Sequence, residues 1–495
     1  MITTRDRSPA SEKLDTVAMP SGRLLFGALP TLSIPSAVAG RLRAAIGLGF
    51  LTEGDRLPRE ADLVQQLGVT AFALREALGM LREDGLIVTR AGKNGGSFVS
   101  RAPGEEAMVS EQLRQLSTTE LRDLGDWRQM LAAESASLAA RRGSASSVER
   151  LNRYAAALDS AETVLAARRA HGRFHIELAA AAQSIRMSRA EFTMFEQFDW
   201  LLSLALADPA RRNASAKELR DIVASIKRRS PRAARAAAER HSTSTVSALV
   251  GLRLSAIAAR VVADGAGQAA PTTSIADEVA SAVDMIMSRL RAIVDAAGRA
   301  MTHSFDAQSL RLQVSRSAMA GLIDGPVELH GIGFIAEPGV IPGHKYFLAC
   351  WRQSEDGAVP DDSHVTDPER DDFYDYPSQD FFTVPRAGGT GVAQGPYVDY
   401  GGVNDYIVTF SLPVLVEGRF VGIAVADLPV ATLEHRLAPW LAGKTRETVV
   451  VNAEGRVVVS NSATYIVGDV LASTTGFQTQ ELPVLDWRVL LGEDN

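Results

Sequence analysis

The sequence predicts a multi-domain chain with three folded parts: a small helix-turn-helix unit with a β-hairpin, an all-α bundle, and an α+β domain that begins with a long helix. Three observations support this division. Residues 54–99 contain two short helical patterns and a glycine-rich turn. Residues 107–258 contain little Pro or Gly. In the last third, apolar runs are separated by Gly, Pro and Asn. A chain of 495 residues has room for about three domains.

The first part, residues 33–102, follows an N-terminal tail of residues 1–32. Apolar residues at helical spacing between Ala61 and Leu67 predict a short helix, and Gly68 supplies the turn after it. Thr70 is expected to N-cap a second helix, with a core side formed by Phe72, Leu74, Ala77, Leu78 and Leu81. Strands over 86–88 and 97–99 are expected to pair around a turn at 91–96.

This stretch, GDRLPREADLVQQLGVTAFALREALGMLREDGLIVTRAGKNGGSFV, resembles the winged helix-turn-helix of the GntR family of bacterial transcription regulators. GDRLP, the LGV turn, LREAL, the DGL run and the Gly-rich wing occur in the family's order and spacing. The resemblance implies that the second helix enters the major groove of a double-stranded DNA operator and that the wing reaches the minor groove. The residues it places at the DNA are Arg56, Arg59, Thr70, Ala71, Phe72, Arg75, Arg90, Lys93, Gly95 and Gly96.

Two positions depart from the family pattern. Where most relatives carry an Arg just after the turn and another early in the preceding helix, this chain has Ala71 and Ala61. An Arg lost from a base edge removes about 1–3 kcal/mol of discrimination, and Arg59 replaces part of the charge. We therefore expect an unusual operator. A winged helix used only for protein contacts is the alternative.

Composition predicts a cytoplasmic protein. The single cysteine, Cys350, excludes an internal disulfide framework, and no apolar run approaches the length of a membrane span or a signal-peptide core. The net charge of −7 is uneven, because residues 330–495 hold 23 acidic and 10 basic residues whereas residues 38–101 have more Lys and Arg than Asp and Glu. Only the N-terminal part has a charge balance suited to binding a polyanion. Neither a phosphate-binding loop nor a nucleophile elbow occurs, so we expect no enzyme.

Residues 107–262 run in helical periodicity and predict a bundle of six or seven helices. The order LRDL, SLAA, FHIELAAAA and AARAAAERH resembles the FCD effector domain of FadR-like GntR regulators. The family binds a divalent metal through an Asp and three His. Here His171 stands at the Asp position and Leu219 at one His position, so the resemblance leaves His171, His175 and His241 as ligands of an ion such as Zn²⁺.

Two alternatives remain open for these bundle residues. The histidines could instead be packed or solvent-facing residues without a metal. Arg128 matches an FCD arginine that commonly meets a ligand carboxylate, and the alternative is that it pairs with Glu134. The metal ion is the only cofactor that the sequence indicates.

The third part, residues 274–495, follows a small, flexible linker at 263–273. A long helix is expected to begin near Ser274, followed by strands and turns. The segment QGPYVDYGGVNDYIVTFSLPVLVEGRFVGIAVADL resembles a Cache domain, a PAS-like sensor, and VVVNAEGRVVVSNSATYIVGDVL looks like a shortened second lobe. The resemblance implies a ligand-sensing domain fused to the DNA-binding part.

Cache domains that bind amines or amino acids carry aromatic and charged residues at a set spacing before and within the sheet. The residues at that spacing here are Tyr374, Gln379, Phe381, Phe382, Tyr397, Asp399 and Asp427. Because Gln379 replaces an Arg that would read a carboxylate, an amine or polar metabolite is favoured over an α-amino acid. The alternative is that the aromatics belong to the core and the two aspartates to turns.

The sequence therefore predicts a ligand-responsive transcription regulator that acts as a homodimer on DNA, with a small-molecule effector and no membrane partner. Operator affinity would change when a metabolite binds the Cache domain. The alternative is a regulator whose effector or metal binds in the FCD-like bundle while the Cache segment serves only assembly.

Overall fold

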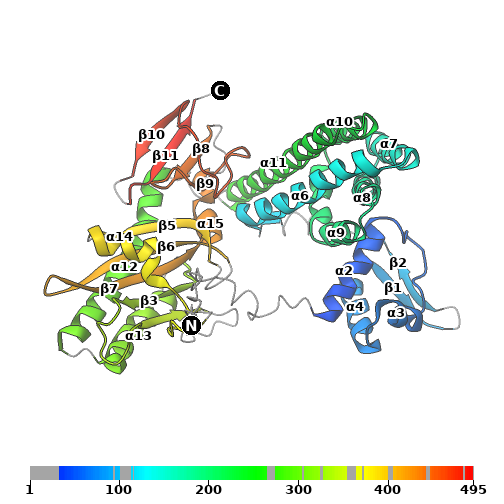
Figure 1. The fold of residues 1–495 in the computed structure, drawn as a ribbon. Coiled ribbons are helices and arrows are strands. Elements are labelled where there is room, and N and C mark those ends of the chain that lie inside the picture. Colours follow the sequence, from blue (N-terminus) through cyan, green and yellow to red (C-terminus); the bar gives the residue numbers. More distant parts are fainter. Residues whose placement is uncertain are drawn as a thin grey trace, which may run out of the picture.

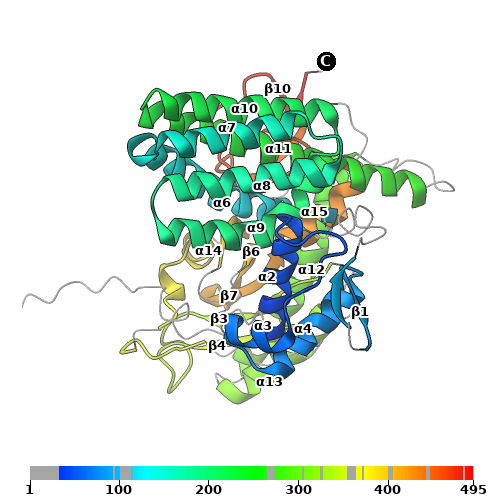
Figure 2. The same cartoon turned by 90° about the vertical axis from the view of Figure 1, so that its right-hand side faces the viewer.

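In the computed structural model, three groups of elements follow one another along the chain (Figures 1 and 2). The expected tail 1–32, Lys93 and linker residues 265–273 lie outside the described residues. The structure describes residues 33–92, 95–100, 113–114, 116–264, 274–303, 306–323, 327–353, 364–370, 373–388, 390–399, 405–441, 446–482 and 485–493.

The first group is a winged helix-turn-helix. Its three helices are α2 (Ile34–Gly47), α3 (Glu60–Leu67) and α4 (Ala71–Glu83), and the wing pairs β1 (Ile87–Arg90) with β2 (Gly96–Val99) antiparallel. Gly68 has a φ of 67°, a left-handed conformation that ends α3. Thr70 caps α4 as expected, since its Oγ1 accepts a hydrogen bond from the Ala73 backbone N at 3.2 Å.

One core prediction for this unit was wrong. Phe72 is 78 % exposed, whereas Leu74, Ala77, Leu78 and Leu81 are buried. Residues two apart on a helix point about 200° from each other, so Phe72 cannot share the face of Leu74. Its aromatic ring instead projects from the first turn of α4 on the side away from the core.

The second group is an all-α bundle of six helices in the described residues. Serine, threonine and aspartate side chains cap most of its helix starts, and Ser117 with Glu120 forms a capping box at the first helix. The helices are α6 (Thr118–Arg142), α7 (Ala145–Asp159), α8 (Val164–Ala181), α9 (Ile185–Ala205), α10 (Pro209–Lys227) and α11 (Pro231–Asp264). Helices α6 and α11 pack closely where Gly125 faces Val246, since a Cβ on Gly125 would lie 2.4 Å from Val246 Cγ2.

The winged helix docks on this bundle through the end of α2. Leu48, just after α2, is fully buried against Phe195 of α9. Arg173 of α8 donates hydrogen bonds to the carbonyls of Leu48 and Gly49 at 2.9 and 3.0 Å, and its guanidinium lies over the Phe50 ring. A cation at these carbonyls satisfies the acceptors left over at a helix C-terminus.

The third group begins with two helices, α12 (Ile275–His303) and α13 (Ala307–Ile323), the first of which is the long helix expected from Ser274. They pack on one face of a five-stranded antiparallel sheet with the order β4-β3-β7-β6-β5. Its strands are β3 (Gly331–Ala336), β4 (Leu348–Arg352), β5 (Val392–Val398), β6 (Tyr406–Val416) and β7 (Arg419–Pro429). A short 3-10 helix, η1 (Tyr376–Ser378), and α14 (Asp380–Gly388) lie on the other face.

Helix α15 (Val430–Leu441) follows β7 directly and leads to a second, four-stranded antiparallel sheet, the expected second lobe. Its strand order is β10-β11-β8-β9, formed by β8 (Thr448–Val451), β9 (Val457–Ser460), β10 (Phe477–Glu481) and β11 (Arg488–Gly492). Figure 1 shows this sheet above the first one and beside the ends of α6 and α11.

Among the helices of the described residues, none combines the length and apolar character that crossing a bilayer requires.

Candidate DNA-binding, metal and ligand sites

The first turns of α4 present the residues that the sequence places at DNA. Ala71, Phe72 and Arg75 are all exposed on this helix. Arg75 Nε lies 3.1 Å from Glu60 Oε2 of α3, with side chains 71 % and 51 % exposed. An exposed ion pair of this kind contributes little to stability, so the Arg75 guanidinium can exchange its partner for a phosphate or a base at low cost.

Of the other predicted basic residues, Arg90 lies in the wing, and Arg56 and Arg59 lie just before α3. Arg56 donates a hydrogen bond to the Gly95 carbonyl, and Arg90 stacks over Phe98 at 4.7 Å. Arg59 is exposed at the start of α3. Gly96 has a φ of 148° and lies so near Arg56 that a Cβ would come within 2.8 Å of Arg56 Nε. These contacts fix the base of the wing, whose tip residue Lys93 lies outside the described residues.

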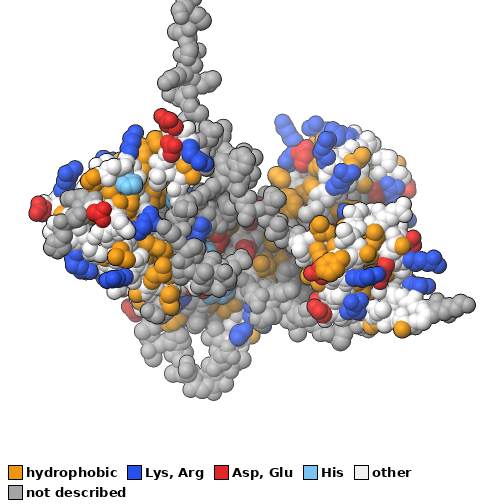
Figure 3. All heavy atoms as spheres, turned by 90° about the horizontal axis from the view of Figure 1, so that it is seen from below, with side chains coloured by type: hydrophobic (Ala, Val, Ile, Leu, Met, Phe, Trp, Pro, Cys, Tyr) orange, Lys and Arg blue, Asp and Glu red, His pale blue; other side chains and the backbone are white. Residues whose placement is uncertain are grey.

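Sequence reasoning missed Arg82 in this region. It stands in the last turn of α4 and its Nη1 lies 3.4 Å from Thr89 Oγ1 of the wing. Seen from below, Lys and Arg side chains are interspersed with Asp and Glu rather than gathered in one basic face (Figure 3).

The bundle brings its three predicted histidines together. His171 and His175 of α8 and His241 of α11 are 2–3 % exposed, and each offers a nitrogen within 4.8 Å of the others. His171 Nε2 and His241 Nε2 are 3.1 Å apart. Both ring nitrogens of His175 are buried without a hydrogen-bond partner among the described residues. Unpartnered buried nitrogens are costly, and a metal ion would satisfy them.

Burial lowers the pKa of all three histidines, so they are held neutral, the form that ligates a metal. Glu218 of α10 counteracts this shift at His241, because its Oε2 lies 2.7 Å from His241 Nδ1. A carboxylate on the far nitrogen of a histidine orients the ring toward a metal. The sequence missed Glu218, which precedes Leu219, the buried residue at the family's missing His position.

Arg128 is 5 % exposed and pairs with Glu191 of α9, not with Glu134, which instead pairs with Arg235. Its Nη2 is buried and makes no hydrogen bond in the described part of the chain. Its charge also contributes to the lowered pKa of His175 after burial itself. Arg128 therefore offers a free donor nitrogen next to the histidine cluster.

A small cavity of about 30 Å³ lies between the first sheet, α14 and the residues His364 and Tyr374 that precede η1. Five of the seven residues predicted for the Cache pocket line it: Tyr374, Phe381, Tyr397, Asp399 and Asp427. Tyr397 Oη and Thr409 Oγ1 are 2.7 Å apart, and Thr409 Oγ1 donates to Asp427 Oδ1 at 2.7 Å. Burial, and then Asp427, raise the pKa of Tyr397 well above its usual value, so its phenol stays neutral and can donate.

The other two predicted residues are not among those lining the cavity. Gln379 is exposed, and its amide nitrogen lies 3.4 Å from the Asp375 carbonyl. Phe382 is fully buried in the cluster with Tyr376 and Phe420, as the alternative of a core aromatic expects. Asp427 lies within β7 rather than in a turn.

Among the cavity residues that sequence reasoning missed are two with basic side chains, Arg352 at the end of β4 and His364. They are more than 60 residues from Asp427, and no local spacing relates them to it. The lining thus includes a guanidinium as well as two carboxylates. A second hollow of about 540 Å³ lies on the second sheet and is lined by polar residues including Glu447, Asn461 and Ser462, with the Tyr465 and Phe477 rings.

Comparison with known proteins assigns the first two parts to families. Residues 35–99 match the model of "Bacterial regulatory proteins, gntR family", and residues 123–244 match the "FCD domain". The chain is 41 % identical over 174 residues to a Mycobacterium gastri protein named as the HTH-type transcriptional regulator RmpR. It is 32 % identical over 171 residues to an Escherichia coli K12 protein named as an L-lactate dehydrogenase operon regulatory protein.

These two matches cover 35 % and 34 % of this chain, and the chain spans 64 % of the length of each relative. Among solved structures, Escherichia coli McbR/YncC is 16 % identical with a TM-score of 0.29, over 44 % of this chain and 98 % of that one. "Methyl-accepting Chemotaxis protein X" is 16 % identical with a TM-score of 0.34, over 50 % and 99 %. These structural likenesses are distant. The N-terminal half of the chain carries a GntR-type winged helix-turn-helix domain followed by an FCD domain.

Proposed function

We propose that this chain is a DNA-binding transcription regulator whose affinity for its operator changes when a small molecule binds its C-terminal, Cache-like domain. The observation that carries the DNA-binding part is the gntR-family match over residues 35–99, together with the exposed first turns of α4. Two copies would bind two half-sites, so the regulator would act as a homodimer.

The mixed chemistry of the cavity near Asp427 supports the ligand-binding part. Aromatic walls from Tyr374, Phe381 and Tyr397 can enclose a cation, and Asp399 with Asp427 supplies the counter-charge. The expected ligand is therefore an amine or another small polar metabolite. A volume of about 30 Å³ holds only about two waters, so a larger ligand must move the lining residues. Such a movement is what a ligand-operated switch needs.

The histidine cluster favours a second candidate function. His171, His175 and His241 would hold a divalent ion such as Zn²⁺, with a coordination position left for an effector carboxylate that Arg128 also binds. The effector would then act in the FCD domain, and the C-terminal domain would serve assembly.

DNA binding is tested with duplexes that the full-length protein enriches from a random pool. Gel shifts should detect a specific complex that Arg75→Ala weakens and Arg153→Ala does not, because Arg153 is an exposed arginine of α7 outside the winged helix. Failure to enrich any sequence, with the protein folded, would refute the proposal. Sedimentation of the same protein reports whether it is a dimer.

Ligand binding is tested by thermal shift of the full chain with a panel of amines, amino acids and dicarboxylates. Amines should raise the melting temperature most, and Asp427→Asn should abolish that rise while Glu447→Gln, in the second-sheet hollow, retains it. The reverse result would move the site to that hollow. Loss of the shift in His175→Ala alone would favour the bundle site instead.

A further inference from the structure

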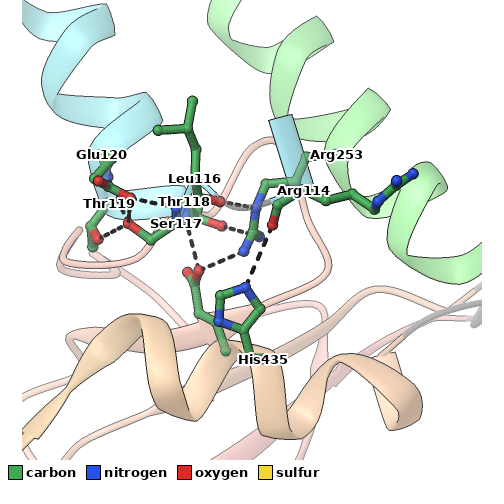
Figure 4. A network of polar contacts seen from close by, with 9 residues as sticks. Arg114, Leu116, Ser117, Thr118, Thr119, Glu120, Arg253 and His435 are labelled. Carbon is green, nitrogen blue, oxygen red and sulfur yellow. Dashed lines mark hydrogen bonds and ion pairs between the residues drawn. The ribbon is translucent and has the colours of Figure 1, made fainter. Parts of the chain in front are cut away.

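The C-terminal domain is joined to the bundle by buried polar contacts centred on Glu434 of α15. Glu434 Oε2 accepts a hydrogen bond from the Thr118 backbone N at 2.9 Å, at the first residue of α6, and lies 3.1 Å from Arg253 Nη2 of α11. Arg253 in turn donates to Thr118 Oγ1 at 3.0 Å and to the Leu116 carbonyl. Figure 4 shows Arg253 pointing at Leu116 and Thr118 at the start of α6.

The charges of this junction are shielded from solvent, so they must be stabilised by each other and by neighbouring protein groups. The Arg253 and Glu434 side chains are 2 % and 3 % exposed. The second carboxylate oxygen of Glu434, Oε1, is buried and makes no hydrogen bond within the described residues. The carboxylate therefore depends on Arg253 and the α6 N-terminus, whose unpaired N–H groups and helix dipole favour an anion.

A second contact lies one turn further along α6. The Tyr406 hydroxyl lies 3.3 Å from Asp123 Oδ1, and the Arg122 guanidinium sits 5.0 Å over the Tyr406 ring. Arg122 also donates a hydrogen bond to the Val467 carbonyl of the second lobe. Arg122 and Thr118 are four residues apart and share one face of α6. The first two turns of α6 are thus held by α15, by β6 and by the segment that follows β9.

Strand β6, and strand β7, which runs directly into α15, carry residues of the ligand cavity. Tyr406 is the first residue of β6, and Thr409, which lines the cavity, is three residues further on. Asp427, in β7, precedes Glu434 by seven residues, and no loop separates β7 from α15. Thr409 and Asp427 are hydrogen-bonded to each other at 2.7 Å. A change at this hydrogen bond therefore acts on β6, which contacts α6 through Tyr406, and on β7, which leads into α15 and Glu434.

We propose that β6 and β7–α15 relay the state of the cavity to the start of α6, with Glu434 and Tyr406 as the positioning residues of the relay. A cation that takes Asp427 from Thr409 would shift the ends of both strands, and the buried contacts would pass that shift to α6. Helix α6 also carries Arg128, and it packs along α11, which carries His241. This inference rests on the proposed function and deepens it: the sensor would act on the FCD domain through α6.

Hydrogen exchange of the full-length protein tests the relay without DNA or an added small molecule. Asp427→Asn should raise the exchange of amides in residues 116–124 several-fold and leave the far end of α10 unchanged. Glu434→Gln should raise it as well. In the Glu434→Gln background, adding Asp427→Asn should change exchange at 116–124 by no more than half as much as in the unmodified chain, because only the Tyr406 contact still links the cavity to α6. The control Glu454→Gln, an exposed carboxylate of the second lobe, should leave the Asp427→Asn response intact.

If Asp427→Asn leaves residues 116–124 unchanged in a folded protein, or if the effects of the two substitutions simply add, the relay is refuted. Should Glu434→Gln prevent folding, Tyr406→Phe takes its place, since it removes only the hydroxyl that reaches Asp123. It should reduce the Asp427→Asn response by at least half, and an undiminished response would again refute the relay. Absence of an amine-induced thermal shift would refute the proposed ligand site. A normal thermal shift, together with unchanged hydrogen exchange at residues 116–124 in Asp427→Asn, would refute the relay alone.

Discussion

Arg253 on α11 and Glu434 on α15 form an ion pair of 3.1 Å although 181 residues separate them in the chain. Because both side chains are buried, removing one partner leaves an uncompensated charge. We expect Glu434→Ala to lower the free energy of unfolding by about 3–5 kcal/mol. Chemical denaturation of the full-length protein measures this loss.

A double substitution provides the control. Arg253→Met with Glu434→Leu removes both charges and fills the space with apolar side chains, so much of the lost stability should return. If Glu434→Ala were as stable as the unmodified chain, the pair would not hold the two domains together.

The Arg75–Glu60 pair predicts opposite effects of its two members on DNA binding. Arg75→Ala removes the cation and should weaken binding by about 1–3 kcal/mol if that residue reaches a base edge. Glu60→Gln frees Arg75 and removes a nearby negative charge, so it should strengthen binding and steepen its dependence on salt. Fluorescence anisotropy at several salt concentrations measures both. If the two variants had the same DNA affinity and the same salt dependence, this face of α4 would not contact DNA.

The histidine cluster predicts one tightly bound divalent metal ion per chain, which elemental analysis of the purified protein would detect. His175→Ala should abolish it. Glu218→Gln should weaken metal affinity by about 10–100-fold, because it loosens the orientation of His241 without removing a ligand. Chelation should lower the melting temperature of the unmodified protein but not that of His175→Ala. If the purified protein held no metal and its melting temperature did not change with chelator or added Zn²⁺, the three histidines would be packed core residues without a metal.

Local sequence patterns predicted the elements better than their contacts. The Thr70 cap, the Gly68 turn and the long helix after Ser274 depend on residues within a few positions of one another, and each was predicted. Phe72 was assigned to the core because apolar character alone does not say which face a residue occupies at the first turn of a helix.

Site residues contributed by distant segments were the ones that the sequence could not supply. Arg352 joins Asp427 only because β4 and β7 both pair with β3. Glu218 reaches His241 only because α10 packs on α11. No periodicity in the sequence indicates such contacts between distant segments. The three histidines were predicted to meet because a family resemblance, not their spacing, linked His241 to the other two.

Gly172 of α8 provides a test of how the winged helix sits on the bundle. A Cβ at this position would lie 2.3 Å from Phe195 Cε2 and 3.0 Å from Leu48 Cδ2, inside the cluster that joins α2 to α9. Gly172→Ala should therefore overpack the junction and cost about 1–3 kcal/mol of stability, although alanine favours a helix. Gly251→Ala is the matched control: a Cβ on that glycine of α11 meets nothing within 4 Å, so this variant should gain up to about 1 kcal/mol. Thermal unfolding compares the two, and limited proteolysis near residue 50 reports release of the winged helix in Gly172→Ala. If both variants were stabilised alike, the close packing of Leu48 and Phe195 around α8 would not exist in solution.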